Sequence, residues 1–247
     1  MGNGFGIDIG GTGIKGALVD LDRGVLAGER VRIPTPQPAT VAAVLDTVQA
    51  VIDQAGWDGP VGCTFPGIVR HGVIGSAANV DKGWIGVNLA EQLSGRTGHP
   101  AVVLNDADAA GIAEMRFGAG RGRGGVVMIV TLGTGIGTAV FVDGVLVPNT
   151  ELGHVELDGV DTETRTSAAA RERESLGFAE WSVRLQRYFS HMEMLFSPDL
   201  FIVGGGISKK ADKFLPRLSL ATEIVPAQLL NQSGIVGAAV EAARAAG

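Results

Sequence analysis

Two short turns of identical composition are candidate anion sites, Gly11-Thr12-Gly13 and Gly133-Thr134-Gly135, each between two apolar runs. Glycine leaves the backbone N–H groups of a turn uncovered. Successive N–H groups then form a concave site for an anion, and threonine hydroxyls add donors. A glycine turn can also be purely structural, because glycine adopts positive φ at no steric cost. The repetition favours the first interpretation, in which both turns hold one phosphate group.

The residues that flank the two turns differ. At a constant offset, Asp8 and Lys15 of the first copy correspond to Val130 and Gly137 of the second. A carboxylate beside phosphates is repelled unless a cation intervenes, and hydrated Mg²⁺ is the usual intermediary. Lys15 would supply positive charge on the phosphate side. We therefore expect Asp8 to organise a Mg²⁺ ion through water, although Asp8 could instead cap the turn.

The stretch "LNDADAAG" (104–111) places Asn105 and Asp106 between an apolar run and a helical pattern. Either side chain could simply accept hydrogen bonds from the first N–H groups of that helix. Asp106 could instead be a general base that accepts a hydroxyl proton during phosphoryl transfer. The sequence alone leaves both interpretations open.

The stretch "TELGHVELDG" (150–159) crowds Glu151, His154 and Glu156 into a glycine-containing segment. Carboxylates and an imidazole together accept and donate hydrogen bonds, as a site for a polyol requires. Asn79, with its donor and acceptor amide, is expected to belong to the same site. The alternatives are solvated loop charges or a metal site, for which one histidine and two glutamates are a weak ligand set.

Strand-turn-strand patterns position both glycine turns, with strands expected near 4–9 and 16–21 and again near 126–132 and 139–144. Further strands are predicted at 61–65, 101–105 and 200–203. Three- and four-residue apolar spacing predicts helices at 39–56, from Asn105 or Asp106 onward, at 171–196 and at 234–246. In the third of these, the apolar positions form a core face: Phe178, Trp181, Leu185, Tyr188, Met192, Leu195 and Phe196.

Composition limits the class of protein. The 247 residues are 45% hydrophobic and 19% charged, which suffices for a core and gives no compositional case for disorder. The net charge of −6 argues against a general nucleic-acid binder. Without an 18-residue apolar run or a signal peptide, we expect no membrane partner and a cytoplasmic location. Cys63 is the single cysteine, so a disulfide within the chain and a cysteine-based zinc cluster are excluded.

Five motifs in order, "DIGGTGIK", "LNDADAAG", "LGTGIGTA", "ELGH" and "IVGGGIS", resemble the ROK (repressor, open reading frame, kinase) sugar kinases of the actin-like ATPase superfamily. The resemblance implies an α/β fold of duplicated actin-like (ribonuclease H-like) domains with a cleft between them. It implies Asp106 as catalytic base for a sugar 6-hydroxyl, and a sugar site of Asn79, Asn105, Asp106, Glu151, His154 and Glu156. It further implies two phosphate loops, with Asp8, Gly10, Gly11, Thr12, Gly13 and Lys15 in one and Gly133, Thr134 and Gly135 in the other.

The chain departs from most ROK members after the Gly-His step, where the family has a cysteine-rich zinc motif; here zinc is expected to be absent. The stretch from Val155 onward resembles the actinobacterial polyphosphate glucokinases, a zinc-free branch. That resemblance implies Mg²⁺-dependent transfer of the terminal phosphate of inorganic polyphosphate, and in some cases of ATP, to the 6-hydroxyl of glucose. A strictly ATP-dependent hexokinase and a non-catalytic sugar-sensing module remain as alternatives. An N-terminal helix-turn-helix module, which a ROK repressor would need, is not found in the sequence.

A polymeric donor needs a track of cations that leads away from the phosphate loops. Gly205 and Gly206 are followed by "SKKADKFLPR", and the expected track comprises Gly205, Gly206, Lys209, Lys210, Lys213 and Arg217. Arg121 and Arg123 would add to it. The alternative is a solvated basic helix face.

The expected domains are residues 1–104, closed by 235–247, and residues 105–234. The family resemblance and the aromatic-rich helix also suggest a homodimer.

Overall fold

The computed structural model describes residues 2–77 and 81–247. The chain forms two compact units, Met1–Ala113 with Gln232–Gly247, and Glu114–Asn231. Each unit is an α/β structure built around one central sheet. The expected domain boundaries, after residue 104 and before residue 235, stay a prediction. Asn79 lies outside the described residues.

The sheet of the first unit has the strand order β3-β2-β1-β5-β8, with β4 paired to β2. Its strands are β1 Asn3–Ile9, β2 Ile14–Asp20, β3 Val25–Leu26, β4 Val31–Ile33, β5 Val61–Phe65 and β8 Ala101–Asn105. β1 pairs antiparallel with β2 and parallel with β5, which in turn is parallel to β8. Every residue of β5 is buried, as is typical of a strand covered on both faces.

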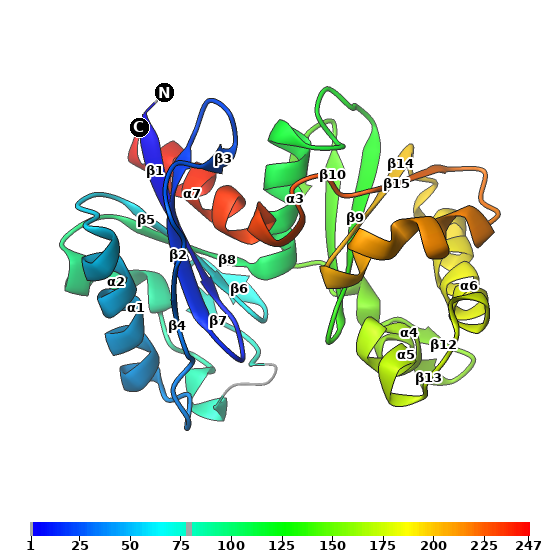
Figure 1. Cartoon of the computed structure of the whole chain (residues 1–247), viewed down its shortest axis with the longest axis horizontal. Helices are drawn as coiled ribbons and strands as arrows, with labels where there is room; N and C mark the ends of the chain where they lie inside the picture. Colours follow the sequence, from blue (N-terminus) through cyan, green and yellow to red (C-terminus); the bar gives the residue numbers. More distant parts are fainter. Residues whose placement is uncertain (1, 78–80) are drawn as a thin grey trace. The chain divides into compact units, whose positions relative to one another are not determined.

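Helices cover this sheet (Figure 1). They are α1 Val41–Ala55, α2 Leu89–Thr97 and α7 Ser233–Ala246, while α3 Asp106–Phe117 continues into the second unit. α1 packs on β2 and β4, and α7 packs on β1 and β5. Glycine permits this approach of α7, because a Cβ at Gly6 or Gly62 would overlap the α7 backbone at Ile235 and Ala238.

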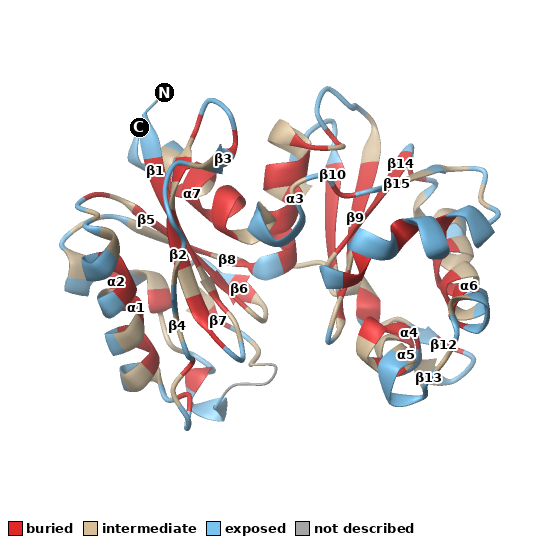
Figure 2. Cartoon of the chain, in the orientation of Figure 1, coloured by how far each residue is buried: buried red, intermediate tan, exposed pale blue. Residues whose placement is uncertain are grey.

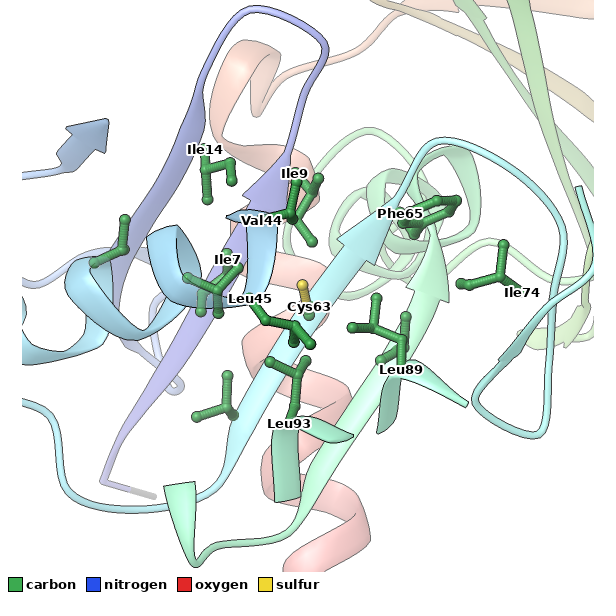
Figure 3. Packing of buried hydrophobic residues seen from close by; sticks show 14 of the residues in the cluster. Ile7, Ile9, Ile14, Val44, Leu45, Cys63, Phe65, Ile74, Leu89 and Leu93 are labelled. Atoms are coloured by element: carbon green, nitrogen blue, oxygen red, sulfur yellow. The ribbon is translucent and has the colours of Figure 1, made fainter. Parts of the chain in front are cut away.

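The core of the first unit lies between the sheet and α1 and α2. Figure 3 shows Ile7 and Cys63 of the sheet with Val44 and Leu45 of α1 among the side chains of this cluster. The helix starts and stops agree with the sequence: Thr40 caps α1 by accepting from the Ala43 N–H, and Gly56 ends it in the left-handed conformation. Short elements complete the unit: β6 Val69–Arg70, β7 Val73–Ile74 and η1 Lys82–Trp84.

The second unit repeats the arrangement, with strand order β11-β10-β9-β14-β15. Its strands are β9 Val126–Leu132, β10 Ile136–Val142, β11 Val145–Val147, β14 Leu200–Gly204 and β15 Glu223–Pro226, with a separate ribbon of β12 Glu156–Leu157 and β13 Val160–Asp161. As in the first unit, an antiparallel hairpin around a Gly-Thr-Gly turn lies beside parallel strands. The helical elements are α4 Thr162–Thr166, α5 Ala168–Arg173, α6 Phe178–Phe196, η2 Leu152–His154, η3 Gly206–Lys213, η4 Leu215–Arg217 and η5 Leu230–Gln232.

The predicted helix at 171–196 was wrong in its first part and in one position of its core face. α5 ends at Arg173, and α6 begins only at Phe178, after Ser175 has turned the chain at a φ of 53°. Figure 2 colours α6 by burial, and its buried residues are Trp181, Ser182, Leu185, Tyr188, Phe189 and Met192. Leu195, in contrast, is 54% exposed. Among the described helices, none combines the length and the apolar character needed to cross a bilayer.

Candidate functional site

The carboxyl ends of the parallel strands β1, β5 and β8 lie at one edge of the first sheet. Their register pairs Asp8 with Thr64 and Phe65 with Asn105. This edge therefore gathers the Asp8 carboxylate, the Asn105 amide and, one residue later, Asp106. The carboxyl edge of parallel strands is where α/β proteins commonly bind ligands.

Asp8 lies between two partners on neighbouring strands. Its Oδ2 accepts from Lys15 Nζ at 2.9 Å, and its Oδ1 accepts from the Thr64 hydroxyl at 3.0 Å. Lys15 was expected in the turn, but it lies in β2 directly opposite Asp8. The two side chains are 28% and 26% exposed, so that this ion pair is reachable from solvent.

Asn105 takes the capping role that the sequence left open. Its Oδ1 accepts from the N–H groups of Ala107 and Asp108 at 2.8 and 3.1 Å, and its Nδ2 donates to Gly67 O at 3.1 Å. Asn105 is 8% exposed, whereas Asp106, the first residue of α3, is exposed. Asp106 Oδ1 shares the Ala107 N–H at 2.9 Å, and the residue remains exposed to solvent.

The first glycine turn is closed by a hydrogen bond from Gly10 N to Gly13 O at 3.2 Å. Arg32 of β4 packs behind it: Arg32 NH2 donates to Thr12 O at 3.3 Å, and a Cβ at Gly13 would come within 2.9 Å of Arg32 Nε. Within the described chain, the N–H groups of Gly11 and Thr12 make no hydrogen bond. They remain as donors for an anion.

The second glycine turn has an acidic neighbour instead. Gly133 N donates to Gly135 O at 2.9 Å, and Gly133 O accepts from Ala169 N of α5 at 3.1 Å. Ile136 N donates to Glu163 Oε2 at 2.8 Å, and a Cβ at Gly135 would overlap that carboxylate. In the part of the chain that the structure describes, the N–H groups of Thr134 and Gly135 are without a hydrogen bond.

Glu151 directly precedes the short helix η2 and His154 is its last residue; η2 packs on β10. Burial, with a smaller contribution from Glu163, raises the pKa of the Glu151 carboxyl, while His154 opposes the rise. His154 Nδ1 lies 2.8 Å from Asp161 Oδ2, and this hydrogen bond raises the pKa of the imidazole. Glu156 is exposed and pairs with Asp161 across the β12–β13 ribbon. The structure thus brings Glu151 and His154 together, with Glu156 on the adjoining strand.

Sequence reasoning missed Asp161 and Glu163. Both lie beyond the recognised Glu-Leu-Gly-His segment, and their charges read as ordinary loop polarity. The one local signal was an aspartate directly before Thr162, a typical helix N-cap, and Asp161 does accept from Glu163 N at 2.9 Å. Nothing in the spacing indicated that the same aspartate would contact His154.

The segment expected to bind the phosphate donor, which starts at Gly205, packs beside the second glycine turn. Gly205 has a φ of 83°, and a Cβ there would overlap the backbone of Leu132, the last residue of β9. Lys209, Lys210, Lys213 and Arg217 follow on η3 and η4, all exposed. Across residues 2–77 and 81–247 these four form no ion pair, whereas several arginines of this unit are paired with carboxylates: Arg123, Arg173, Arg184 and Arg187.

A further cation lies close to this segment. Arg171 of α5 stacks on Phe178, with its Cζ 4.1 Å from the ring centroid, and Lys213 Nζ lies 5.7 Å from the same centroid. Two cations therefore converge on one aromatic ring. Arg123, in contrast, forms an ion pair with Glu223, and its part in the track stays a prediction, as does that of Arg121.

A metal site of protein ligands alone is not found: within the described residues no three or more His, Cys, Asp or Glu side chains are placed to hold an ion. Mg²⁺ needs less, because it is commonly held by one or two carboxylates together with water and substrate phosphates. The Asp8 carboxylate is partly exposed and has lone pairs beyond its two hydrogen bonds. The residues present therefore fit a hydrated Mg²⁺ bound beside Asp8.

Two sheets, each opening with a hairpin around a Gly-Thr-Gly turn, and an exposed aspartate at the carboxyl edge of one of them are typical of actin-like phosphotransferases. The sequence profile of the ROK family matches residues 4–177. The chain belongs to the ROK family and has the actin-like ATPase fold.

Similarity to individual proteins is high over nearly the full length. The chain is 51% identical over 239 residues to a polyphosphate glucokinase of Mycobacterium tuberculosis (strain CDC 1551 / Oshkosh), covering 96% of this chain and 90% of that protein. The crystal structure of an inorganic polyphosphate/ATP-glucomannokinase from Arthrobacter sp. strain KM superposes with a TM-score of 0.94 at 58% identity, covering 99% and 100% of the two chains. A ROK family glucokinase from Streptomyces griseus, solved with glucose and AMPPNP, superposes with a TM-score of 0.85 at 26% identity, covering 98% and 100%.

Proposed function

We propose that this protein is a polyphosphate glucokinase, which transfers the terminal phosphate of inorganic polyphosphate to the 6-hydroxyl of D-glucose to give glucose 6-phosphate. The observation that carries the phosphotransferase assignment is the exposed Asp106 carboxylate, which stands at the sheet edge that also holds Asp8 and Lys15. The similarity to a polyphosphate glucokinase and to a polyphosphate/ATP-glucomannokinase supports the acceptor and the donor.

In this proposal Asp106 is the general base. It accepts the proton of the glucose 6-hydroxyl while the oxygen attacks phosphorus. General base catalysis of this kind typically raises a reaction rate about 10²–10⁴-fold. Asn105 supports this role, because it binds the first amides of α3 and so fixes the backbone on which Asp106 stands. Asn79, Asn105, Glu151, His154 and Glu156 bind the sugar hydroxyls.

The two glycine turns hold the phosphoryl group through their uncovered amides, with Thr12 and Thr134 adding hydroxyl donors. Lys15 places a positive charge at the first turn and is kept there by Asp8. When Mg²⁺ is bound, held through water near Asp8, it neutralises negative charge on the phosphates. Phosphoryl transfer leaves the protein mainly to position groups and stabilise charge, which is what these side chains do.

The unpaired cations Lys209, Lys210, Lys213 and Arg217 support the polymeric donor. A carboxylate partner would neutralise such a side chain, and these four have none in the described chain. Arg171, which shares the Phe178 ring with Lys213, is proposed to join the track. Binding through several such contacts weakens steeply with salt, as polyanion binding generally does.

ATP as a second donor and mannose as a second acceptor are favoured by the likeness to the polyphosphate/ATP-glucomannokinase. We further propose that the enzyme acts in the cytoplasm and forms a homodimer. Exposed apolar side chains of α6 support the dimer, because Val183 and Met194 are 70% and 67% exposed.

The test is glucose 6-phosphate formation with Mg²⁺, run in parallel with ATP and with long-chain polyphosphate at matched phosphate concentration. Faster turnover on polyphosphate is expected. Turnover on ATP alone would still support Asp106 as the base, but the basic residues would then be interpreted as a solvated surface. Absence of turnover with both donors, together with tight glucose binding, would favour the sugar-sensing module.

A further inference from the structure

His154 is held from one side of its ring. Its Nδ1 lies 2.8 Å from Asp161 Oδ2, and the side chain is otherwise 52% exposed. Gly153 anchors this segment, because the Ile136 carbonyl occupies the place that a Cβ at residue 153 would take. The imidazole therefore has a fixed backbone on β10 and one fixed side-chain contact.

Asp161 is itself fixed at both of its oxygens. Oδ1 accepts from Glu163 N at 2.9 Å as the N-cap of α4, while Oδ2 contacts His154. With both oxygens engaged, the carboxylate cannot rotate without losing one bond. The two ring nitrogens of an imidazole point in different directions, so that holding Nδ1 also sets the direction of Nε2.

We propose that Asp161 is a positioning residue for glucose: it fixes His154 in the form that carries a proton on Nδ1, so that Nε2 is presented to a sugar hydroxyl. This inference rests on the proposed function, since it takes the ligand of His154 to be glucose. A carboxylate that orients an imidazole in this way is a recurrent device at ligand sites.

The charged groups that face His154 all raise the pKa of its imidazole. The hydrogen bond to Asp161 raises the pKa of the imidazole most, Glu163 and Glu151 add to the rise, and partial burial opposes it. The imidazolium therefore persists to higher pH than in a free histidine. As pH rises through the raised pKa, Nε2 loses its proton and changes from a hydrogen-bond donor to an acceptor.

The same carboxylates connect the sugar-binding histidine to the second glycine turn. Asp161 caps α4, Glu163 in the first turn of α4 accepts from Ile136 N, and Ile136 directly follows the turn. A displacement of Asp161 would thus disturb both His154 and the amides of the turn. Sugar and phosphate contacts in this unit are linked through one short helix.

The test uses the full-length protein with the substitution Asp161→Asn. Asparagine caps a helix about as well as aspartate, so that α4 is retained while the charge at His154 is removed. Asp158→Asn is the matched control: it makes the same charge change in the same ribbon, but Asp158 pairs with Arg187 instead. Ring-nitrogen NMR of the histidines, of which the chain has only four, reports the tautomer and pKa of His154 without substrate.

For Asp161→Asn we expect a lower pKa of His154, a change of its tautomer and a glucose KM raised about tenfold with kcat little changed. Asp158→Asn should leave all of these near the wild-type values. In a His154→Gln background, Asp161→Asn should raise the glucose KM no further, because the two residues act as one unit.

An unchanged His154 ring spectrum in Asp161→Asn, or an equal effect of Asp158→Asn, would overturn the inference. So would a full additional effect of Asp161→Asn in the His154→Gln background. Failure of the proposed function is distinguishable, because the wild-type protein would then form no glucose 6-phosphate while the ring spectrum still reported the contact with Asp161.

Discussion

The two Gly-Thr-Gly turns share a sequence and a place in their hairpins, but opposite charges stand behind them. Gly13, the last residue of the first turn, packs against the Arg32 guanidinium, and Gly135, the last residue of the second, packs against the Glu163 carboxylate. The strands beside the first turn also carry the Asp8–Lys15 ion pair, whereas the residues at the same offset in the second hairpin are Val130 and Gly137.

The difference shows that two turns of the same sequence can contribute differently to one function. Uncovered amides are common to both, so both are suited to an anion. The cations of the first turn, Lys15 and Arg32, add attraction for phosphate. At the second turn the acidic group instead fixes the backbone. Glu163 accepts from the Ile136 N–H, and the N–H groups of Thr134 and Gly135 stay available for a ligand. Attraction for phosphate is thus expected mainly at the first turn, and support for backbone shape at the second.

The largest expected effect comes from Asp106, which stands in the unit of the first turn. Asp106→Asn should lower kcat about 10³-fold, because a base with no charge cannot take the hydroxyl proton. Glucose affinity should be largely preserved, as measured by tryptophan fluorescence during glucose titration. Lost affinity with retained turnover would instead make Asp106 a binding residue.

A smaller loss is expected when the charged flank of the first turn is removed. Lys15→Met should lower kcat/KM for the phosphate donor about 10²-fold, since it removes a cation from the developing phosphate charge and leaves Asp8 unpaired. Glu163→Gln at the second turn should change kcat/KM by no more than about threefold, because glutamine can still accept from Ile136 N. Equal losses at both positions would contradict the proposed division of tasks.

The last glycines of the two turns, Gly13 and Gly135, should also differ in how far their replacement lowers stability. Gly135→Ala should destabilise the protein by about 1–3 kcal/mol, because its Cβ displaces a glutamate that is hydrogen-bonded to the backbone. Gly13→Ala should cost about 0.5 kcal/mol or less, because the exposed Arg32 side chain can move aside. Urea unfolding measures both, and in a Glu163→Ala background the cost of Gly135→Ala should fall.

The smallest expected effect concerns the donor track of the second unit. Combined replacement of Lys209, Lys210 and Lys213 by glutamine should raise the KM for long polyphosphate severalfold and flatten its salt dependence, with a smaller change for ATP. Arg173→Gln is the control, because Arg173 is already paired with Glu174. An equal change in the KM for both donors would assign these lysines to general electrostatics.

Much of the fold could be predicted because its signals are local. Apolar spacing placed α1, and the polar and glycine caps at Thr40 and Gly56 set its ends. The break between α5 and α6 was missed, because Ser175 and Gly177 interrupt a pattern that continues in spacing on both sides. Leu195 was assigned to the core because it is apolar and fits the spacing. Which apolar side chains of α6 are buried depends on the elements that pack against the helix, and none of them covers Leu195 fully.

By itself the sequence determined the two glycine turns, the family and the candidate chemistry, because residue types and their local spacing carry that information. Tertiary structure decided which carboxylates meet which partners. Asp161 reaches His154 and Glu163 reaches Ile136 through contacts between separate elements. Asn105 binds two amides of α3, and Asp106 shares one of them. A side chain's partner depends on the packing of strands and helices distant in sequence, and that packing is settled only when the whole chain folds.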